Sequence, residues 1–158
     1  WLANDAAYRS AVKYATDNEV LIVNSAGNAD ELNPRRQSIK EIVLVCSVKS
    51  GDKLDQDVKS KFSNYGNGVD ICGPGDPIYS TVQSYTGTQN AFRFMKGTSM
   101  AAPTVAATAA LIWSQNPNFT VADVKKRLFT TADNIDVKNE KYKGLLGAGR
   151  LNTFNAVK

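Results

Sequence analysis

Ser99 lies within residues 96–103, which read KGTSMAAP, directly before the alanine-rich apolar run TVAATAALIW. A serine at the start of a helix is well placed for acyl transfer, because free N–H groups and the positive end of the helix dipole can stabilise an oxyanion. Serine is also a common helix N-cap, and this purely structural role is the alternative. The sequence contains no histidine that could accept the proton of Ser99.

Asn28 ends the segment NSAGN, which follows the apolar run VLIV at residues 20–23. Sheets of α/β proteins place ligands and catalytic side chains at the carboxyl ends of their parallel strands. An amide at such a position can donate a hydrogen bond to a developing oxyanion and so supplement the N–H of Ser99. An asparagine in a glycine turn is otherwise ordinary turn chemistry. Ser99 and Asn28 are therefore the candidate catalytic residues.

Three apolar runs predict the framework that carries these residues. Residues 20–23, 42–48 and 69–72 are mainly apolar and lack a regular polar alternation, which is typical of parallel strands covered by helices on both faces. Residues 80–85 and 92–96 instead alternate in polarity around TGTQN, and this pattern predicts a β-hairpin that leads to Gly97. The sequence thus favours an α/β fold with a mostly parallel sheet.

Helical periodicity and capping residues predict four helices. Asn4 or Asp5 can cap the first, which should end near residues 17–18, and residues 99–114 are apolar nearly all round and so predict a central buried helix. Thr120 with Asp123 forms a weak capping pair for a third helix, and Asn152 can cap a short last one.

Composition limits the classes of protein that this chain can be. A length of 158 residues suits one domain, and the apolar runs are far shorter than the about 20 residues of a membrane span. The net charge of +4 comes from scattered basic residues, which indicates a solvated surface and no nucleic-acid interface. Cys46 and Cys72 lie in apolar contexts and are predicted to be buried thiols, too few for a structural zinc site.

Several motifs together carry a resemblance to a known family. The segments NSAGN, FSNYG, VDICGPG, GTSMAAP and GAGRLNTFNAV occur in the order and approximate spacing of the subtilisin-like serine proteases, the subtilases of peptidase family S8. The resemblance covers essentially the whole chain. It implies the three-layer subtilisin-like sandwich, with Ser99 as nucleophile, Asn28 as side-chain oxyanion donor, and a specificity pocket built partly around Asn28 and the loop near Pro34.

The same resemblance carries expectations about substrate, cofactor and compartment. It implies a protein or peptide substrate, no catalytic cofactor, and a parent protein that is secreted or held in the cell envelope. Structural calcium is compatible with the family, but the sequence assigns no ligands to it. Neither nucleic acid nor a membrane is expected as a partner.

The departure from the family pattern concerns the other two members of the catalytic triad. In subtilases the triad runs Asp, His, Ser along the chain, and Asp and His precede the turn that carries the oxyanion asparagine. Here only one predicted helix precedes that turn, and histidine is absent. We therefore expect residues 1–158 to be the C-terminal portion of a catalytic domain, present only in part and inactive alone, with Asp and His on a complementary N-terminal fragment.

Four other interpretations remain open at this stage. Lys96 could act as the base in a Ser-Lys arrangement, which requires a desolvated lysine. The chain could be a catalytically inactive scaffold with a structural or binding role. The glycines of the segment 147–149 could bind a nucleotide, although no third glycine follows at the Rossmann spacing. Asp30 and Glu31 could bias a specificity pocket toward basic residues, or be solvated loop charges.

Overall fold

The computed structural model describes residues 4–51, 54, 56–83 and 91–158. Its helices and strands alternate in the first half of the chain, and helices dominate the second half. In chain order they are α1 (Ala6–Asp17), β1 (Val23–Ser25), η2 (Arg35–Ser38), β2 (Val43–Lys49), β3 (Ile71–Asp76), β4 (Ile78–Thr81), β5 (Phe92–Met95), α2 (Thr98–Gln115), α3 (Val121–Thr130), η3 (Asp136–Lys138), η4 (Glu140–Tyr142) and α4 (Thr153–Ala156).

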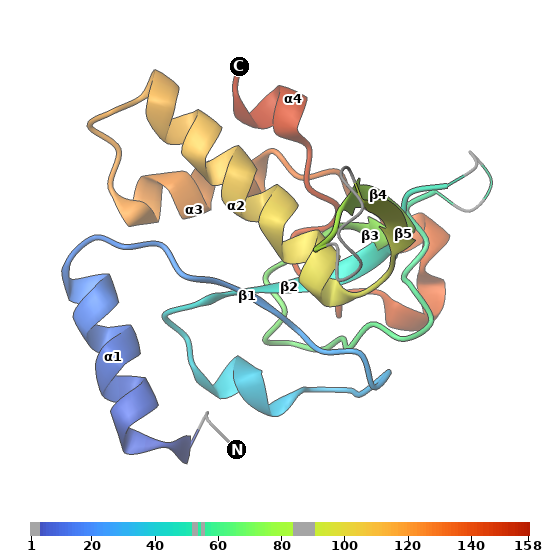
Figure 1. The fold of residues 1–158 in the computed structure, drawn as a ribbon, viewed down its shortest axis with the longest axis horizontal. Coiled ribbons are helices and arrows are strands. Elements are labelled where there is room, and N and C mark those ends of the chain that lie inside the picture. The colour runs from blue at the N-terminus through green and yellow to red at the C-terminus, as the bar shows by residue number, and fades with distance from the viewer. Residues whose placement is uncertain (1–3, 52–53, 55, 84–90) are drawn as a thin grey trace.

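A parallel sheet of order β1-β2-β3 forms the centre of the molecule (Figure 1). Val23 pairs with Val43, and Val45 pairs with Ile71, so the three strands end at the same edge. Residues 149–151 bond to the outer side of β3 through Cys72. The first strand begins only at the last residue of the run 20–23, where pairing with β2 begins.

The side chains of β2 alternate between two hydrophobic cores. Val43 and Val45 face a core formed with α2, α3 and α4, whereas Leu44 and Cys46 face a second core that includes Val12 of α1 and residues of the C-terminal loops. Helices thus cover both faces of a parallel sheet, as the uninterrupted apolar pattern of residues 42–48 predicts. The predicted α/β class, with a mostly parallel sheet in three layers, is confirmed.

β3 is longer than the sequence predicts, because it continues through the segment GPGD. A side chain at Gly73 would approach Ala101 O to 2.9 Å, and one at Gly75 would approach Gly97 O to 2.7 Å. The two glycines therefore let the first turn of α2 lie directly against the strand. These glycines allow the close approach of α2 to β3, and they do not end the strand.

α2 packs against the sheet and against α3, but only one face of the helix is buried. Ala101, Val105 and Ile112 pack into the core, whereas Pro103 is exposed and Leu111 is 49% exposed. The prediction of a helix buried all round is therefore wrong for the described chain, because the sheet covers one side and no described segment covers the other. Within the described residues, no helix has the length and apolar character of a membrane span.

The predicted helix caps are present. Asp5 accepts a hydrogen bond from the Tyr8 N–H at the start of α1, and Asn152 accepts one from the Asn155 N–H at the start of α4. Thr120 and Asp123 form a complete capping box at the start of α3. These local signals specify the helix starts independently of the packing around them.

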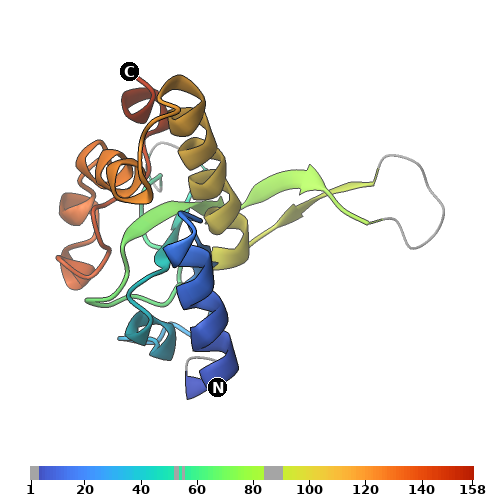
Figure 2. The same ribbon diagram turned by 90° about the vertical axis from the view of Figure 1, so that its left-hand side faces the viewer.

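The predicted hairpin is also present. β4 and β5 pair antiparallel, with Tyr79 opposite Phe94, and the hairpin projects from the body of the molecule (Figure 2). The segment TGTQN, predicted as its turn, lies outside the described residues. β5 leads directly into Gly97 and α2.

Cys46 and Cys72 form a disulfide, so the prediction of two free buried thiols is wrong. The parallel register places the two residues directly opposite each other on β2 and β3, with their Cα atoms 4.3 Å apart. Both are fully buried. The sequence assigns each cysteine to a strand, and only the pairing of the strands brings the sulfur atoms together.

Asp70, directly before β3, forms hydrogen bonds with two neighbouring segments. Its Oδ2 accepts the Leu44 N–H at 2.7 Å, and its carbonyl oxygen accepts the Ala148 N–H at 2.8 Å. Burial raises the pKa of the Asp70 carboxyl above its ordinary value of 3.8, and the Leu44 N–H, Lys125 and Lys40 only partly oppose this effect. The ionised carboxylate is therefore less favourable in the folded chain than in the unfolded one.

We predict that Asp70→Asn changes the pH dependence of stability in a defined direction. The folded state binds the Asp70 proton more tightly than the unfolded state, so wild-type stability relative to the variant should fall as pH rises from below 3.8 through the raised pKa. The variant amide keeps an oxygen that can accept the Leu44 N–H. Urea unfolding of both proteins across this pH range gives the free energy of unfolding of the wild type minus that of the variant. A value that stays constant or rises with pH would contradict the prediction.

Candidate active site

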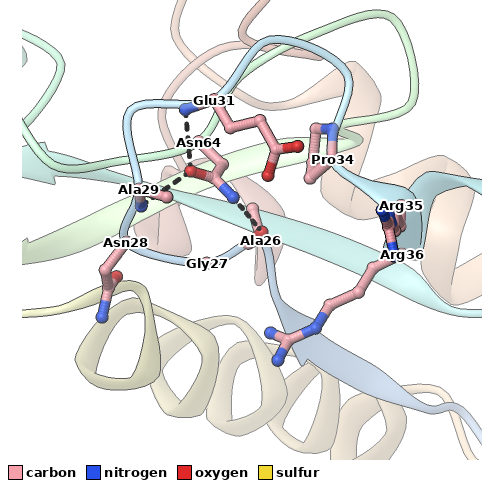
Figure 3. Close-up of a pocket in the computed structure, with 9 residues that line it drawn as sticks. All are labelled: Ala26, Gly27, Asn28, Ala29, Glu31, Pro34, Arg35, Arg36 and Asn64. Carbon is pink, nitrogen blue, oxygen red and sulfur yellow. Dashed lines mark hydrogen bonds between the residues drawn. The ribbon is translucent and has the colours of Figure 1, made fainter. Parts of the chain in front are cut away.

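Two segments meet at the carboxyl end of β1: the turn of residues 26–31 and the first turn of α2. The Asn28 side chain points toward α2 (Figure 3), where its Oδ1 accepts the Thr98 N–H at 2.9 Å and the Thr98 hydroxyl at 2.8 Å. The same hydroxyl accepts the Gly27 N–H at 3.1 Å. Because Oδ1 is occupied by two donors, the Asn28 Nδ2 group is the one left to donate elsewhere.

Ser99 directly follows the residue that binds Asn28. It is exposed in the first turn of α2, and no described residue forms a hydrogen bond with its hydroxyl. A Cβ atom on Gly97 would lie 3.4 Å from Asn28 Nδ2 and 3.7 Å from Ser99 N, so both donors lie beside this glycine. The structure thus brings together the two candidate residues that the sequence places in separate motifs.

A pocket lies on each side of this pair. The pocket on the Ser99 side has a volume of about 340 Å³ and is mainly apolar, with Ile78, Met95 and Met100 in its wall. The pocket on the Asn28 side has a volume of about 420 Å³ and is lined by the turn, by Asn64 and by Pro34, Arg35 and Arg36 (Figure 3). Ser99 and Asn28 each line one of these two pockets.

The pocket beside Asn28 carries charges of both signs. Glu31, Arg35 and Arg36 line it, and the Arg36 guanidinium is held toward β1 because its Nη1 donates to Ser25 O at 2.6 Å and to Ser25 Oγ at 3.1 Å. Asp30 is not part of this lining. Of the two acidic residues considered from the sequence, only Glu31 therefore reaches the pocket, and it does so together with two arginines.

Asp30 instead pairs with a buried lysine behind the turn. Lys59 Nζ lies 2.7 Å from Asp30 Oδ1, and the lysine side chain is 1% exposed, whereas that of Asp30 is 50% exposed. The ammonium also lies over the rings of Tyr65 and Tyr142, at 5.0 and 4.6 Å from their centroids. An ion pair and two ring faces together offset the cost of removing this charge from water.

Asn64 holds the backbone of the same turn. Its Oδ1 accepts the N–H groups of Ala29 and Glu31, both at 2.9 Å, and its Nδ2 donates to Ala26 O at 3.0 Å (Figure 3). Sequence reasoning missed Thr98 as a partner of Asn28, and Asn64 and Lys59 as partners of the turn that carries it. The motif FSNYG was visible, but nothing local indicates that its asparagine contacts a turn so far away in the chain.

Two of the other interpretations lose their structural basis. Lys96 is exposed, so the desolvation that a Ser-Lys arrangement requires is not provided. Gly147 has a φ of +62°, and a side chain there would collide with the backbone of Asp70. Gly149 is similarly close to Asp133. The glycines of residues 147–149 are therefore explained by chain packing, without a nucleotide.

In the described part of the chain, no group of three or more His, Cys, Asp or Glu side chains could hold a metal ion.

The chain is similar to known proteins over most of its length. The model of the subtilase family matches residues 3–149. A thermophilic serine proteinase of Bacillus sp. strain AK1 is 36% identical over 149 residues, which are 94% of this chain and 33% of the relative. The cell wall-associated protease of Bacillus subtilis is 38% identical over 120 residues, which are 76% of this chain and 12% of the relative.

A solved structure gives the same result for the fold. The crystal structure of a cold adapted subtilisin-like serine proteinase aligns with a TM-score of 0.78 and 30% identity, over 96% of this chain and 51% of the other. The chain thus spans about a third to a half of the length of the thermophilic proteinase and of this solved structure. The family match, the relatives and the shared fold together show that this chain belongs to the subtilase family of serine proteases.

Proposed function

We propose that this chain provides the nucleophile and the oxyanion-binding groups of a serine endopeptidase that hydrolyses peptide bonds through an acyl-enzyme. Ser99 Oγ attacks the peptide carbonyl, and Asn28 Nδ2 and the Ser99 N–H donate to the resulting oxyanion. The observation that carries the proposal is the double donation from Thr98 to Asn28 Oδ1, which leaves Nδ2 free to donate beside Ser99.

The general base must come from outside this chain, because the sequence contains no histidine. In the proposed reaction a histidine on an N-terminal half takes the proton from Ser99 Oγ as the C–O bond forms, and then gives it to the leaving amine. An aspartate on the same half orients the imidazole. The chain's coverage of about half the length of the solved relative is compatible with this division.

Two surfaces that no described segment covers are consistent with such a partner. Among the described strands, β1 pairs with β2 alone, so no described strand lies along its other edge. The outward face of α2 exposes Pro103, Ala107 and Leu111. A complementary half that covers both surfaces would complete the sheet and bury the helix.

A catalytically inactive scaffold is the second candidate. It is favoured by the absence of histidine and by the lack of any described hydrogen-bond partner for the Ser99 hydroxyl. Packing alone, however, gives no reason for an oriented amide beside an exposed serine at a helix N-terminus. The endopeptidase is therefore the better supported of the two.

We also propose that the parent protein is exported, to the exterior or to the cell envelope. One relative is named a cell wall-associated protease. Disulfides persist mainly in oxidising compartments, and the disulfide between Cys46 and Cys72 therefore supports export.

We predict that a fluorophosphonate probe labels Ser99 only when a complementary half carrying Asp and His is present. The isolated chain should remain unlabelled and should not hydrolyse peptides, because no base activates the hydroxyl. Intact-mass analysis measures the adduct, and Ser99→Ala serves as the negative control. Absence of labelling with the companion half would favour the inactive scaffold, and peptidase turnover by the isolated chain that Ser99→Ala abolishes would refute the need for a companion.

We predict that Thr98→Val lowers kcat of the assembled enzyme by about tenfold, with little change in KM, because Asn28 Oδ1 and the Gly27 N–H each lose a partner. Thr98→Ser keeps the hydroxyl and should stay close to the parent. Asn28→Ala removes the amide itself and should lower kcat further. Loss of the corresponding donor in subtilisin lowers kcat by about 10²- to 10³-fold.

The matched control for Thr98→Val is Thr130→Val on α3, whose hydroxyl donates only to Lys126 O within its own helix. It should leave kcat unchanged. Steady-state kinetics on one peptide substrate compare all four variants, and equal kcat values for Thr98→Val and Thr98→Ser would argue against an orienting role of the hydroxyl.

A further inference from the structure

We propose that Asn64 is a positioning residue for the oxyanion site, and that it acts by holding the backbone of the turn that carries Asn28. The inference rests on the proposed function. Asn64 is 4% exposed, lines the pocket beside Asn28, and lies across the turn from α2 (Figure 3). Its side-chain hydrogen bonds go to the backbone of the turn and not to Ser99. Its role is to fix the position of the Asn28 backbone, from which the amide side chain extends.

One side chain satisfies three backbone groups of the turn. Asn64 Oδ1 accepts the N–H groups of Ala29 and Glu31, while Nδ2 donates to Ala26 O. The Asn64 N–H donates in addition to Gly27 O at 3.0 Å. The bonded groups lie on both sides of Asn28, so Asn64 fixes the residue before and the residue after the proposed oxyanion donor.

The shape of this turn needs such support. Gly27 has a φ of +107° and Asp30 a φ of +52°, so the backbone is left-handed on each side of Asn28. A non-glycine residue in this region is held there by its surroundings. The space is also closely fitted, because a Cβ atom on Gly27 would lie 2.6 Å from Asn64 Nδ2.

Asn28 is thus held at two points by residues from different parts of the chain. Thr98 orients the amide from α2, and Asn64 fixes the backbone from the segment that follows β2. Lys59, in the same segment, pairs with Asp30 and so supports the far end of the turn. Oxyanion stabilisation depends on donors held in place before the reaction, and a shift of about 1 Å can cost about 10²-fold in rate.

The decisive variant is Asn64→Asp in the assembled enzyme. The variant carboxylate can still accept the Ala29 and Glu31 N–H groups, but at neutral pH it places an acceptor against Ala26 O. We expect kcat to fall by about tenfold or more, with a smaller change in KM. The ratio of variant to parent kcat should recover as pH falls, because a protonated carboxyl can donate to Ala26 O as the amide does.

Asn67→Asp is the matched control. It is the same substitution three positions along, at an exposed residue whose side chain forms no hydrogen bond with the described residues, and it should leave kcat and its pH profile unchanged. A double-mutant cycle with Asn28→Ala then tests the route of the effect. If Asn64 acts through Asn28, the substitution should cost little further kcat in the Asn28→Ala background. An equal loss in both backgrounds would overturn the proposal and leave Asn64 with a general structural role.

Amide hydrogen exchange on the chain itself provides a readout that does not need activity. Asn64→Asp should accelerate exchange of the Thr98 N–H, which donates to Asn28 Oδ1, whereas Asn67→Asp should not. Unchanged protection at Thr98 in Asn64→Asp would overturn the positioning role. If the assembled parent shows no turnover that depends on Ser99, the proposed function fails, and the exchange result alone decides whether Asn64 holds Asn28.

Discussion

The hydroxyl of Thr98 is the contact on which the arrangement of the site depends. It donates to Asn28 and accepts from Gly27, so a single oxygen atom joins the end of β1 to the beginning of α2. That junction requires α2 to start close to the sheet, which Gly73 and Gly75 permit on β3. The parallel register then brings the turn after β1 to the same edge of the sheet as this helix start.

The opposite side of the turn is built from groups that are costly to bury unless they are paired. Asn64 is satisfied by backbone groups, and Lys59 by Asp30 and two tyrosine rings. Both side chains come from the segment between β2 and β3. Burying Lys59 and Asn64 would be unfavourable without the partners that the turn provides. The stability of these two buried side chains therefore depends on the same turn that positions Asn28.

Local features of the sequence predicted local structure well. The capping residues of α1, α3 and α4, the buried strand β2 and the paired strands of the hairpin follow from side-chain chemistry within a few residues. Ser99 and Asn28 were identified from their motifs, and the structure brings them to one place. Their catalytic roles remain predictions.

The features that sequence reasoning missed are all non-local. The disulfide depends on the register of two strands, and the contacts of Asn64 and Lys59 depend on how a distant segment folds against the turn. The exposed face of α2 was missed for a related reason. Its composition shows that the helix is apolar, but it does not show on which side a covering segment is present.

The disulfide between Cys46 and Cys72 has a consequence beyond the joining of two strands. The cysteines are 26 positions apart, and the intervening chain contains both Lys59 and Asn64. The segment behind the oxyanion turn is therefore a covalently closed loop, and in the chain-entropy description such a closure disfavours the unfolded state by about 3 to 4 kcal/mol. In an oxidising environment the two residues that hold the turn are tethered to the sheet, so local opening of this region cannot carry them far from it.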